Sequence, residues 1–387
     1  MVYLDYAATT PMYPEAAAAM RPFQSETFGN PSGAHAAARA AKTALEEARE
    51  QVAAALGAQP SEIVLTGGGT EADNLAVKGV ARAARDAGKG DGVVTTAFEH
   101  KGVLAPCDRL ARDGFRVTRV AVDGAGIVDL GALEAALDDR TVVVSVMLVN
   151  NEVGTIQPLA DVARLVRARA PHAALHTDAV QAVPWLDVAE TTAGADLVSV
   201  SAHKFGGPKG VGALVRRGDV PIEPLIEGGG QEWGLRSGTA NVAGAVGMAE
   251  ALRVTERRRG EEVARIGPLR DRLARGLTER VPSSFVNGDP ARKVAGNCHI
   301  GFSGVEAEAL LVALDHDGVC AAAGSSCTSG ATEPSHVLAA MGVPRMDALA
   351  SIRLSLGYAS TDTDVDAALE LIPRAVDRLR PAVTASP

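Results

Sequence analysis

Lys204 is the residue whose type and position most clearly suggest chemistry. It follows residues 197–200, an apolar and β-branched run that predicts a short buried strand, and Gly206, Gly207 and Pro208 then break the backbone. Lysine is scarce, with seven residues in a chain of 387. A lysine amine can form a Schiff base with a carbonyl compound when burial or a nearby positive charge lowers its pKa, which arginine cannot do. On position alone, the alternative is a lysine that extends from a loop into solvent.

Other polar side chains also follow predicted strands. Thr70 comes after three glycines at a predicted helix start, where it either binds an anion or only caps the helix. His100 and Asp178 each follow a strand as well, although the first could be an ordinary histidine and the second a cap of its turn. Neither a Walker sequence nor G-x-G-x-x-G is present, so nucleotide binding is not indicated.

Two further candidates lie near the C-terminus. Arg353 interrupts an apolar strand, where it could pair with any carboxylate. Cys327 lies among glycine, serine and threonine, which leave a thiol accessible, although it could also be a loop thiol without a role. The other cysteines form no C-x-x-C pair and no zinc spacing, and no metal site is expected.

The elements around these residues predict how they meet. Helices expected at 35–56, 75–87, 103–113 and 159–170 alternate with strands expected at 63–66, 93–96, 141–149, 173–177 and 197–201. Such alternation favours a mostly parallel sheet that is covered on both faces, with its sites outside the carboxyl ends of the strands. We therefore expect the side chains that follow these strands to share one edge: Thr70, His100, Asn151, Asp178 and Lys204.

Together these residues are the set that pyridoxal 5'-phosphate requires. The cofactor needs a lysine for its Schiff base, an aspartate for its pyridinium nitrogen, and hydroxyl or glycine donors for its phosphate. The sequence also resembles the cysteine desulfurases from end to end, in the branch of the iron–sulfur-assembly and nitrogenase-associated enzymes. The segments that carry the resemblance begin at Leu4 (LDYAATTP), Gly29 (GNPS), Gly69 (GTEADN), Glu99 (EHK), Asn150 (NNEVG), His176 (HTDAVQ), Ser201 (SAHK), Arg236 (RSGT), Ser326 (SCTS) and Ser351 (SIRLSLG).

The resemblance implies a role for each residue. Lys204 holds the cofactor, His100 stacks on its ring and moves protons, and Cys327 takes the sulfur of L-cysteine as a persulfide while L-alanine is released. Arg353 and Asn151 bind the substrate, and Thr239 reaches the phosphate from a second subunit of a homodimer. The full set implied to bind the cofactor is Gly69, Thr70, His100, Asn151, Asp178, Gln181, Ser201, His203, Lys204 and Thr239.

The resemblance also implies the fold known as pyridoxal-phosphate fold type I, an α/β architecture. A mostly parallel seven-stranded sheet between helices is expected in a large domain, residues 15–259. A smaller α+β domain, residues 1–14 and 260–387, carries the Cys327 loop. From the sequence pattern itself, a charged helix is expected over 241–258, with a change near Gly260.

Composition limits the other possibilities. The formal net charge is −9, so direct binding of nucleic acid is not expected. No apolar run approaches the roughly 20 residues of a membrane span, and a cytoplasmic protein is expected. The alternatives are a selenocysteine lyase or aminotransferase of this fold, and a non-catalytic sulfur-relay protein. The sulfur acceptor stays open between iron–sulfur assembly, tRNA thiolation and DNA phosphorothioation, and the actinobacterial desulfurase of the last pathway is one candidate.

Overall fold

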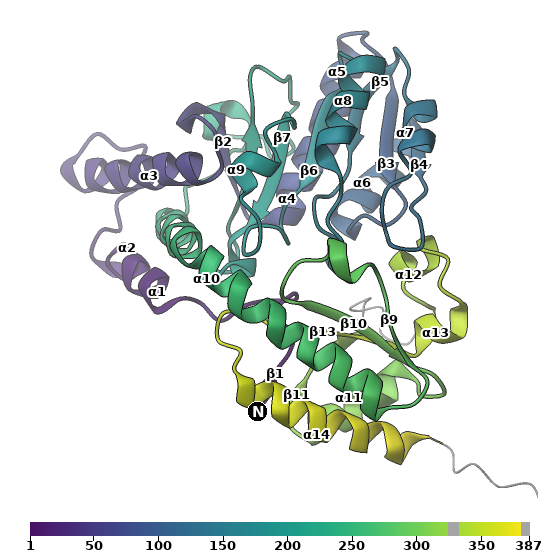
Figure 1. The fold of residues 1–387 in the computed structure, drawn as a ribbon. Coiled ribbons are helices and arrows are strands. Elements are labelled where there is room, and N and C mark those ends of the chain that lie inside the picture. Colours follow the sequence, from purple (N-terminus) through teal and green to yellow (C-terminus); the bar gives the residue numbers. More distant parts are fainter. Residues whose placement is uncertain (324–332, 381–387) are drawn as a thin grey trace, which may run out of the picture.

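The central element of the computed structural model, which describes residues 1–323 and 333–380, is a seven-stranded sheet (Figure 1). Strand β8 runs antiparallel to both of its neighbours, and all other neighbouring pairs are parallel. The order across the sheet is β2 (Ile63–Thr66), β8 (Gly212–Arg216), β7 (Leu197–Ser201), β6 (Ala174–Asp178), β5 (Thr141–Ser145), β3 (Gly92–Thr96) and β4 (Arg116–Val120). The predicted mostly parallel seven-stranded sheet is confirmed.

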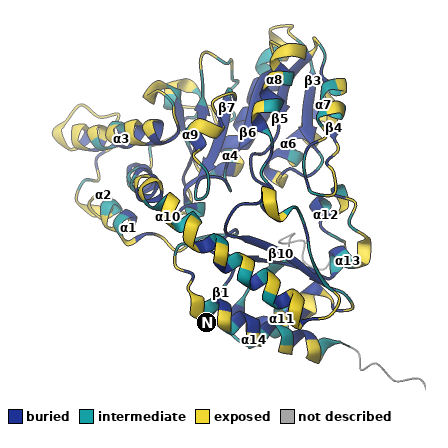
Figure 2. Cartoon of the chain, viewed as in Figure 1, coloured by how far each residue is buried: buried dark blue, intermediate teal, exposed yellow. Residues whose placement is uncertain are grey.

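Helices cover both faces of this sheet, and its strands other than the edge strand β4 are largely buried, as the dark strands of Figure 2 show. Successive side chains of a strand point to opposite faces, so Val93 packs in one buried cluster and Val94 in the other. The first cluster lies under α4 (Gly69–Asn74), α5 (Val80–Asp86) and α6 (Lys101–Arg112). The second lies under α1 (Pro14–Met20), α3 (Ala36–Ala55), α7 (Leu130–Ala136), α8 (Leu159–Arg169), α9 (Val188–Thr191) and the first half of α10 (Val242–Arg280). The short α2 (Pro22–Ser25) follows α1.

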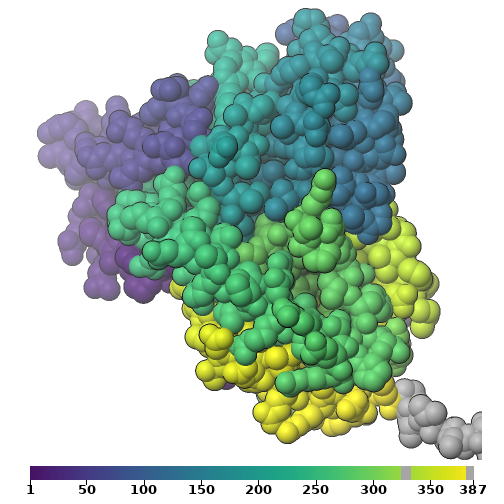
Figure 3. Space-filling view, viewed as in Figure 1, coloured from purple at the N-terminus to yellow at the C-terminus, as the bar shows by residue number. Residues whose placement is uncertain are grey.

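A second, antiparallel sheet forms the smaller unit, in the order β12 (Ala322–Ala323), β13 (Ser351–Ser355), β10 (Asn297–Phe302) and β9 (Ser284–Val286). Its core packs under the second half of α10, α11 (Ala307–His316) and α14 (Asp362–Leu379). At the N-terminus, β1 (Val2–Tyr3) pairs in parallel with β11 (Val319–Cys320). Two short helices, α12 (His336–Ala340) and α13 (Arg345–Leu349), lie between β12 and β13 in the chain. Figure 3 shows the green and yellow surface of this unit in continuous contact with the teal surface of the larger one.

The sequence predicted that the helix beginning at residue 241 changes character near Gly260, and α10 shows no such break. It is one helix of 39 residues that passes through Gly260 without a break. Its first part packs on α1 and α3 and its second part on α14, and such packing outweighs the roughly 1 kcal/mol that a glycine costs inside a helix. The domain boundary predicted at 259 and 260 falls inside this helix and stays a prediction. In the part of the chain described, no helix is long and apolar enough to cross a membrane.

Candidate active site

A cavity of about 290 Å³ lies at the carboxyl ends of the central strands. It is lined by residues from the N-terminal segment, the loops that follow the strands, and β13 of the smaller sheet. Ten of the twelve site residues predicted from the sequence line it: Gly69, Thr70, His100, Asn151, Asp178, Gln181, Ser201, His203, Lys204 and Arg353. The structure thus brings together residues that lie up to 284 positions apart in the sequence. Their individual roles remain predictions.

Lys204 ends a single 3-10 turn that follows directly from β7. Its Nζ donates hydrogen bonds to the carbonyl oxygen of Ala7 at 2.6 Å and to that of Ala8 at 2.9 Å. Burial, and then the positive charge of Arg353, lower the pKa of Lys204 to about 8. A substantial fraction of the amine is therefore neutral in mildly alkaline solution, which is the form that attacks a carbonyl.

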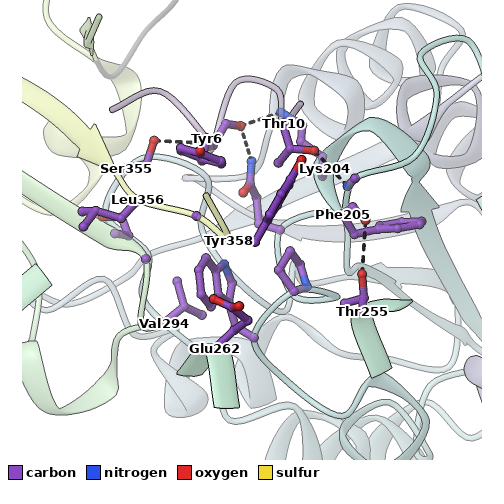
Figure 4. Close-up of a pocket in the computed structure, with 18 of the residues that line it drawn as sticks. Tyr6, Thr10, Lys204, Phe205, Thr255, Glu262, Val294, Ser355, Leu356 and Tyr358 are labelled. Atoms are coloured by element: carbon purple, nitrogen blue, oxygen red, sulfur yellow. Dashed lines mark hydrogen bonds between the residues drawn. The ribbon is translucent and has the colours of Figure 1, made fainter. Parts of the chain in front are cut away.

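The burial of Lys204 has a visible cause on its far side. A second, smaller cavity at the seam between the two sheets also reaches Lys204, and Figure 4 shows aromatic side chains around it, among them Tyr6, Phe205 and Tyr358. Tyr358 also packs against Tyr13, with ring centroids 4.4 Å apart. These rings make much of the wall on that side of the lysine apolar, and apolar walls offer no hydrogen bonds to the charged form of an amine.

Two carboxyl groups and one imidazole form a tight group in the lining of the cavity. Asp73, His100 and Asp178 each place one side-chain atom within 4.8 Å of the others. Burial raises the pKa of Asp178, and burial together with the charge of Asp178 raises the pKa of Asp73 well above its usual range. Two carboxylates so close cannot both ionise easily. Asp73, whose pKa is raised further above its usual range, is therefore the carboxyl that more readily keeps a proton.

His100 faces the open cavity, although the walls around it desolvate the imidazole and lower its pKa. Its Nδ1 accepts a hydrogen bond from the backbone N–H of Gly102 at 2.9 Å, and this contact caps α6. In the neutral ring the proton is therefore on Nε2. The cap fixes the ring at the helix start, so it is oriented before any ligand binds.

The opposite side of the cavity offers hydrogen-bond donors. The backbone turns at Gly68, whose φ of +146° suits glycine alone, and α4 begins at Gly69. Helix α4 continues through a π-helical segment (Leu75–Gly79) and α5 to Asp86. A Cβ on Gly69 would lie 2.7 Å from Val180 Cγ2 and 3.4 Å from Ser201 Cβ, so glycine keeps this wall narrow. Free N–H groups at a helix start and the hydroxyl of Ser201 suit a phosphate.

Arg353 belongs to β13 of the smaller sheet, and its side chain reaches the loop that follows β5 of the larger one. Its guanidinium donates to the carbonyl of Asn151 at 2.8 Å and to Asp5 Oδ1 at 2.9 Å. The side chain is 3% exposed, and its Nε has no hydrogen-bond partner among the described residues. Asn151 Oδ1 is likewise buried without a partner there. Buried polar atoms usually have partners, so both point to a ligand that this site is built to bind.

Taken as a set, these groups fit pyridoxal phosphate. Asp178 offers a carboxyl for the ring nitrogen, the α4 start and Ser201 offer phosphate donors, and Lys204 offers the amine. Arg353 offers a planar donor for a carboxylate. Every one of these groups lines the same cavity.

Two predicted site residues are not in the cavity. Thr239 is exposed on the loop before α10 and does not line the cavity of its own chain. Cys327 lies outside the described residues.

Some residues of the site were not predicted from the sequence. Asp73 could have been found, because it lies one helical turn after Gly69 and so shares its face. The Ala7 and Ala8 carbonyls and Asp5 left no such signal, since their roles depend on contacts across almost 200 residues or more.

Comparisons with known proteins agree with this geometry. The profile of the family described as "Aminotransferase class-V" matches residues 2–368. The "IscS-like cysteine desulfurase" of Mycobacterium tuberculosis (strain ATCC 25618 / H37Rv) is 48% identical over 391 residues, which covers 100% of this chain and 99% of that protein. A solved structure titled "NIFS-LIKE PROTEIN" has a TM-score of 0.92 and 38% identity, and the match covers 98% of this chain and 100% of that one. The crystal structure of DndA from Streptomyces lividans matches with a TM-score of 0.77 and 37% identity, over 91% of this chain and 99% of that one. The chain therefore belongs to the class-V aminotransferase family, within its cysteine desulfurases.

Proposed function

We propose that this chain is a pyridoxal-phosphate-dependent cysteine desulfurase that converts L-cysteine to L-alanine and takes up the sulfur as a persulfide on Cys327. One observation carries the proposal: the Lys204 amine, the Asp178 carboxyl and the Arg353 guanidinium line one cavity. The names of the relatives support the choice of substrate.

Bound pyridoxal phosphate would supply the electron-withdrawing ring that makes the substrate Cα proton acidic. Lys204 would hold the cofactor, and its amine would accept the substrate Cα proton. Asp178 would hold the ring nitrogen in its protonated form, Gln181 would bind the phenolic oxygen, and Asn151 would contact the cofactor or the substrate. Gly69, Thr70, Ser201 and His203, with Thr239 from a second subunit, bind the phosphate. Arg353 binds the substrate carboxylate.

His100 and Cys327 complete the reaction. The Cys327 thiolate forms a bond to the substrate sulfur as the carbon–sulfur bond breaks, and the carbon is then protonated to give alanine. An ordinary cysteine thiol has a pKa near 8.5, so a base is required. His100 is our candidate, because its ring faces the cavity. Its Nδ1 lone pair accepts from the Gly102 N–H, so His100 would take up the thiol proton only after this hydrogen bond is released.

The enzyme in this proposal is a cytoplasmic homodimer that passes sulfur to an acceptor protein. Cys107, Cys298 and Cys320 are free thiols in the described part of the chain, as expected in a reducing compartment. The acceptor stays open between iron–sulfur assembly, tRNA thiolation and DNA phosphorothioation.

Two measurements test the proposal. Borohydride reduction of the purified protein should fix a pyridoxyl group on Lys204, and Lys204→Ala should abolish it. Incubation with L-cysteine should add one sulfur to Cys327, located by mass spectrometry, with release of alanine. The Cys327→Ser variant should still bind cysteine and change its visible spectrum, but form almost no alanine. If this variant turns over normally, or the sulfur is found on another cysteine, the mechanism through Cys327 is wrong. If the wild-type enzyme takes up no sulfur from cysteine on any thiol, an aminotransferase or lyase becomes the better assignment.

A further inference from the structure

Residues 335–341, which follow the Cys327 segment, rest on the edge of the large sheet. The Ser335 hydroxyl donates a hydrogen bond to Glu152 Oε2, and both side chains are buried. His336 Nε2 lies 2.9 Å from the carbonyl oxygen of Glu99. Because a carbonyl can only accept, His336 Nε2 must carry a proton and donate it. We call Glu152, Ser335 and His336 the junction.

Ser335 also caps helix α12. Its hydroxyl oxygen accepts hydrogen bonds from the backbone N–H groups of Val337 at 3.1 Å and Leu338 at 3.4 Å, so it caps α12. The same hydroxyl therefore both starts this helix and attaches it to Glu152. Such a cap contributes about 1 kcal/mol to a helix, and α12 has only five residues.

Apolar packing strengthens the attachment. Val337 and Leu338 of α12, with Met341 just beyond it, share a buried cluster with Phe98, Met147 and Val153, which belong to loops that follow β3 and β5. This cluster is separate from the cores of both sheets. Although α12 belongs to the C-terminal part of the chain, its buried face lies against the active-site edge of the large sheet.

The junction involves residues that are direct sequence neighbours of active-site residues. Glu99 directly precedes His100, and Glu152 directly follows Asn151, whose carbonyl accepts from Arg353. Ser335 lies eight residues after Cys327 in the sequence. On the other side of that cysteine, Ala322 of β12 pairs with Arg353 of β13. Both flanks of the Cys327 segment are thus attached to the walls around Arg353 and Asn151.

We infer that Glu152, Ser335 and His336 are positioning residues for sulfur transfer. They hold the C-terminal flank of the Cys327 segment against the loops of His100 and Asn151, so that the thiol reaches the substrate sulfur at a useful rate. Burial raises the pKa of Glu152, and the hydrogen bond from Ser335 is the strongest of the contacts that oppose this rise, so Ser335 stabilises the Glu152 carboxylate at the junction. The inference rests on the proposed function, because it presupposes that Cys327 receives the sulfur.

The test separates substrate binding from sulfur transfer in the cofactor-loaded enzyme. Ser335→Ala and Glu152→Ala remove the contact, whereas Glu152→Gln keeps an oxygen that can accept from Ser335. Stopped-flow spectra with L-cysteine report substrate binding, and quenched mass spectrometry reports the rate of persulfide formation on Cys327. Hydrogen exchange at the Val337 and Leu338 amides reports attachment of α12 without any reaction.

We expect Ser335→Ala and Glu152→Ala to slow persulfide formation by roughly ten- to hundredfold, as misplacement of a reacting group does. Cysteine binding should change less than about twofold, and the two amides should exchange faster. Glu152→Gln should restore slow exchange and most of the rate.

A matched control removes a helix cap elsewhere. Thr361 caps α14 on the outside of the smaller unit, and Thr361→Ala should lower stability without a selective loss of persulfide formation. If Ser335→Ala transfers sulfur at the normal rate, or if Thr361→Ala slows transfer equally, the inference is wrong while the proposed function stands. If the wild-type enzyme forms no persulfide on Cys327, the proposed function itself fails.

Discussion

Lys204 lies in surroundings that favour its neutral amine, yet it is not left without partners. The Ala7 and Ala8 carbonyls accept its hydrogen bonds, and neither carries a full negative charge that would stabilise the ammonium form. Aromatic rings line the cavity behind it, and Arg353 adds a positive charge in front. A Schiff-base lysine needs this balance, because a strongly held ammonium group could not attack the cofactor.

The lowered pKa of Lys204 predicts a pH dependence of stability in the cofactor-free protein. Between pH 8 and 10.5 the unfolded chain binds the proton that the folded chain has lost. The free energy of unfolding should therefore rise with pH across this window, by up to about 3 kcal/mol from this residue. Lys293, whose pKa burial also lowers to about 8, adds a similar rise.

Comparison with the Lys204→Met variant isolates the lysine. Urea unfolding at several pH values should show a smaller rise with pH in this variant than in the wild type, and Lys209→Met, which alters an exposed lysine, should keep the full rise. Equal slopes in the wild type and Lys204→Met would mean that Lys204 titrates normally in the folded protein.

Among the elements, α10 decides how the two sheets are joined. It packs on α3 over the large sheet and on α14 over the small one, so one continuous helix contacts the cores of both sheets. A Cβ built on Gly260 would meet no atom within 4 Å. The surroundings of residue 260 therefore leave room for a side chain larger than that of glycine.

Gly260→Ala should stabilise the protein by about 0.5–1 kcal/mol, because alanine loses less backbone entropy in a continuous helix. Chemical denaturation measures the change. The control is Gly57→Ala, at a site with a φ of +63° and with Ala189 Cβ only 2.8 Å from the new methyl group, and it should destabilise. A loss of stability in Gly260→Ala would show that the helix bends or breaks at this residue.

At the scale of the whole molecule, the loop before α10 has the character of an interface. Glu232 and Trp233 have positive φ values of 48° and 56°, which cost energy in residues other than glycine. A buried ion pair from Arg49 to both oxygens of Glu232 holds this strained turn. Trp233 is nevertheless 53% exposed, as expected of a large side chain that a second subunit would cover. The exposed Thr239 lies a few residues further along.

A homodimer with shared sites predicts complementation between inactive subunits. Lys204→Ala and Thr239→Val subunits should each be impaired alone. In a mixed dimer, one site combines an intact Lys204 from one subunit with an intact Thr239 from the other, so mixing should restore desulfurase activity. Mixing by unfolding and refolding, followed by an alanine assay and light scattering, measures this. Activity no higher than the average of the two parents, or an active monomer, would show that Thr239 does not act across subunits.

The sequence by itself determined the features that depend on short-range order. Alternating helices and buried strands indicated the parallel sheet, and Thr70, Asp178 and Lys204 were expected at one edge because parallel strands end together. The resemblance to the cysteine desulfurases added Gln181, Ser201 and His203, which line the same cavity.

Only the tertiary structure decided the rest. The N-terminal carbonyls under Lys204, the Asp73 carboxyl beside Asp178 and the contact from Ser335 to Glu152 were not predicted. The continuity of α10 through Gly260 was missed as well, since packing on two cores outweighs a local glycine penalty. The physical reason is that hydrophobic periodicity reports which face of a segment is buried, but not which distant segment covers it. Ser335 and Glu152 lie 183 residues apart, and only the folded chain brings them together.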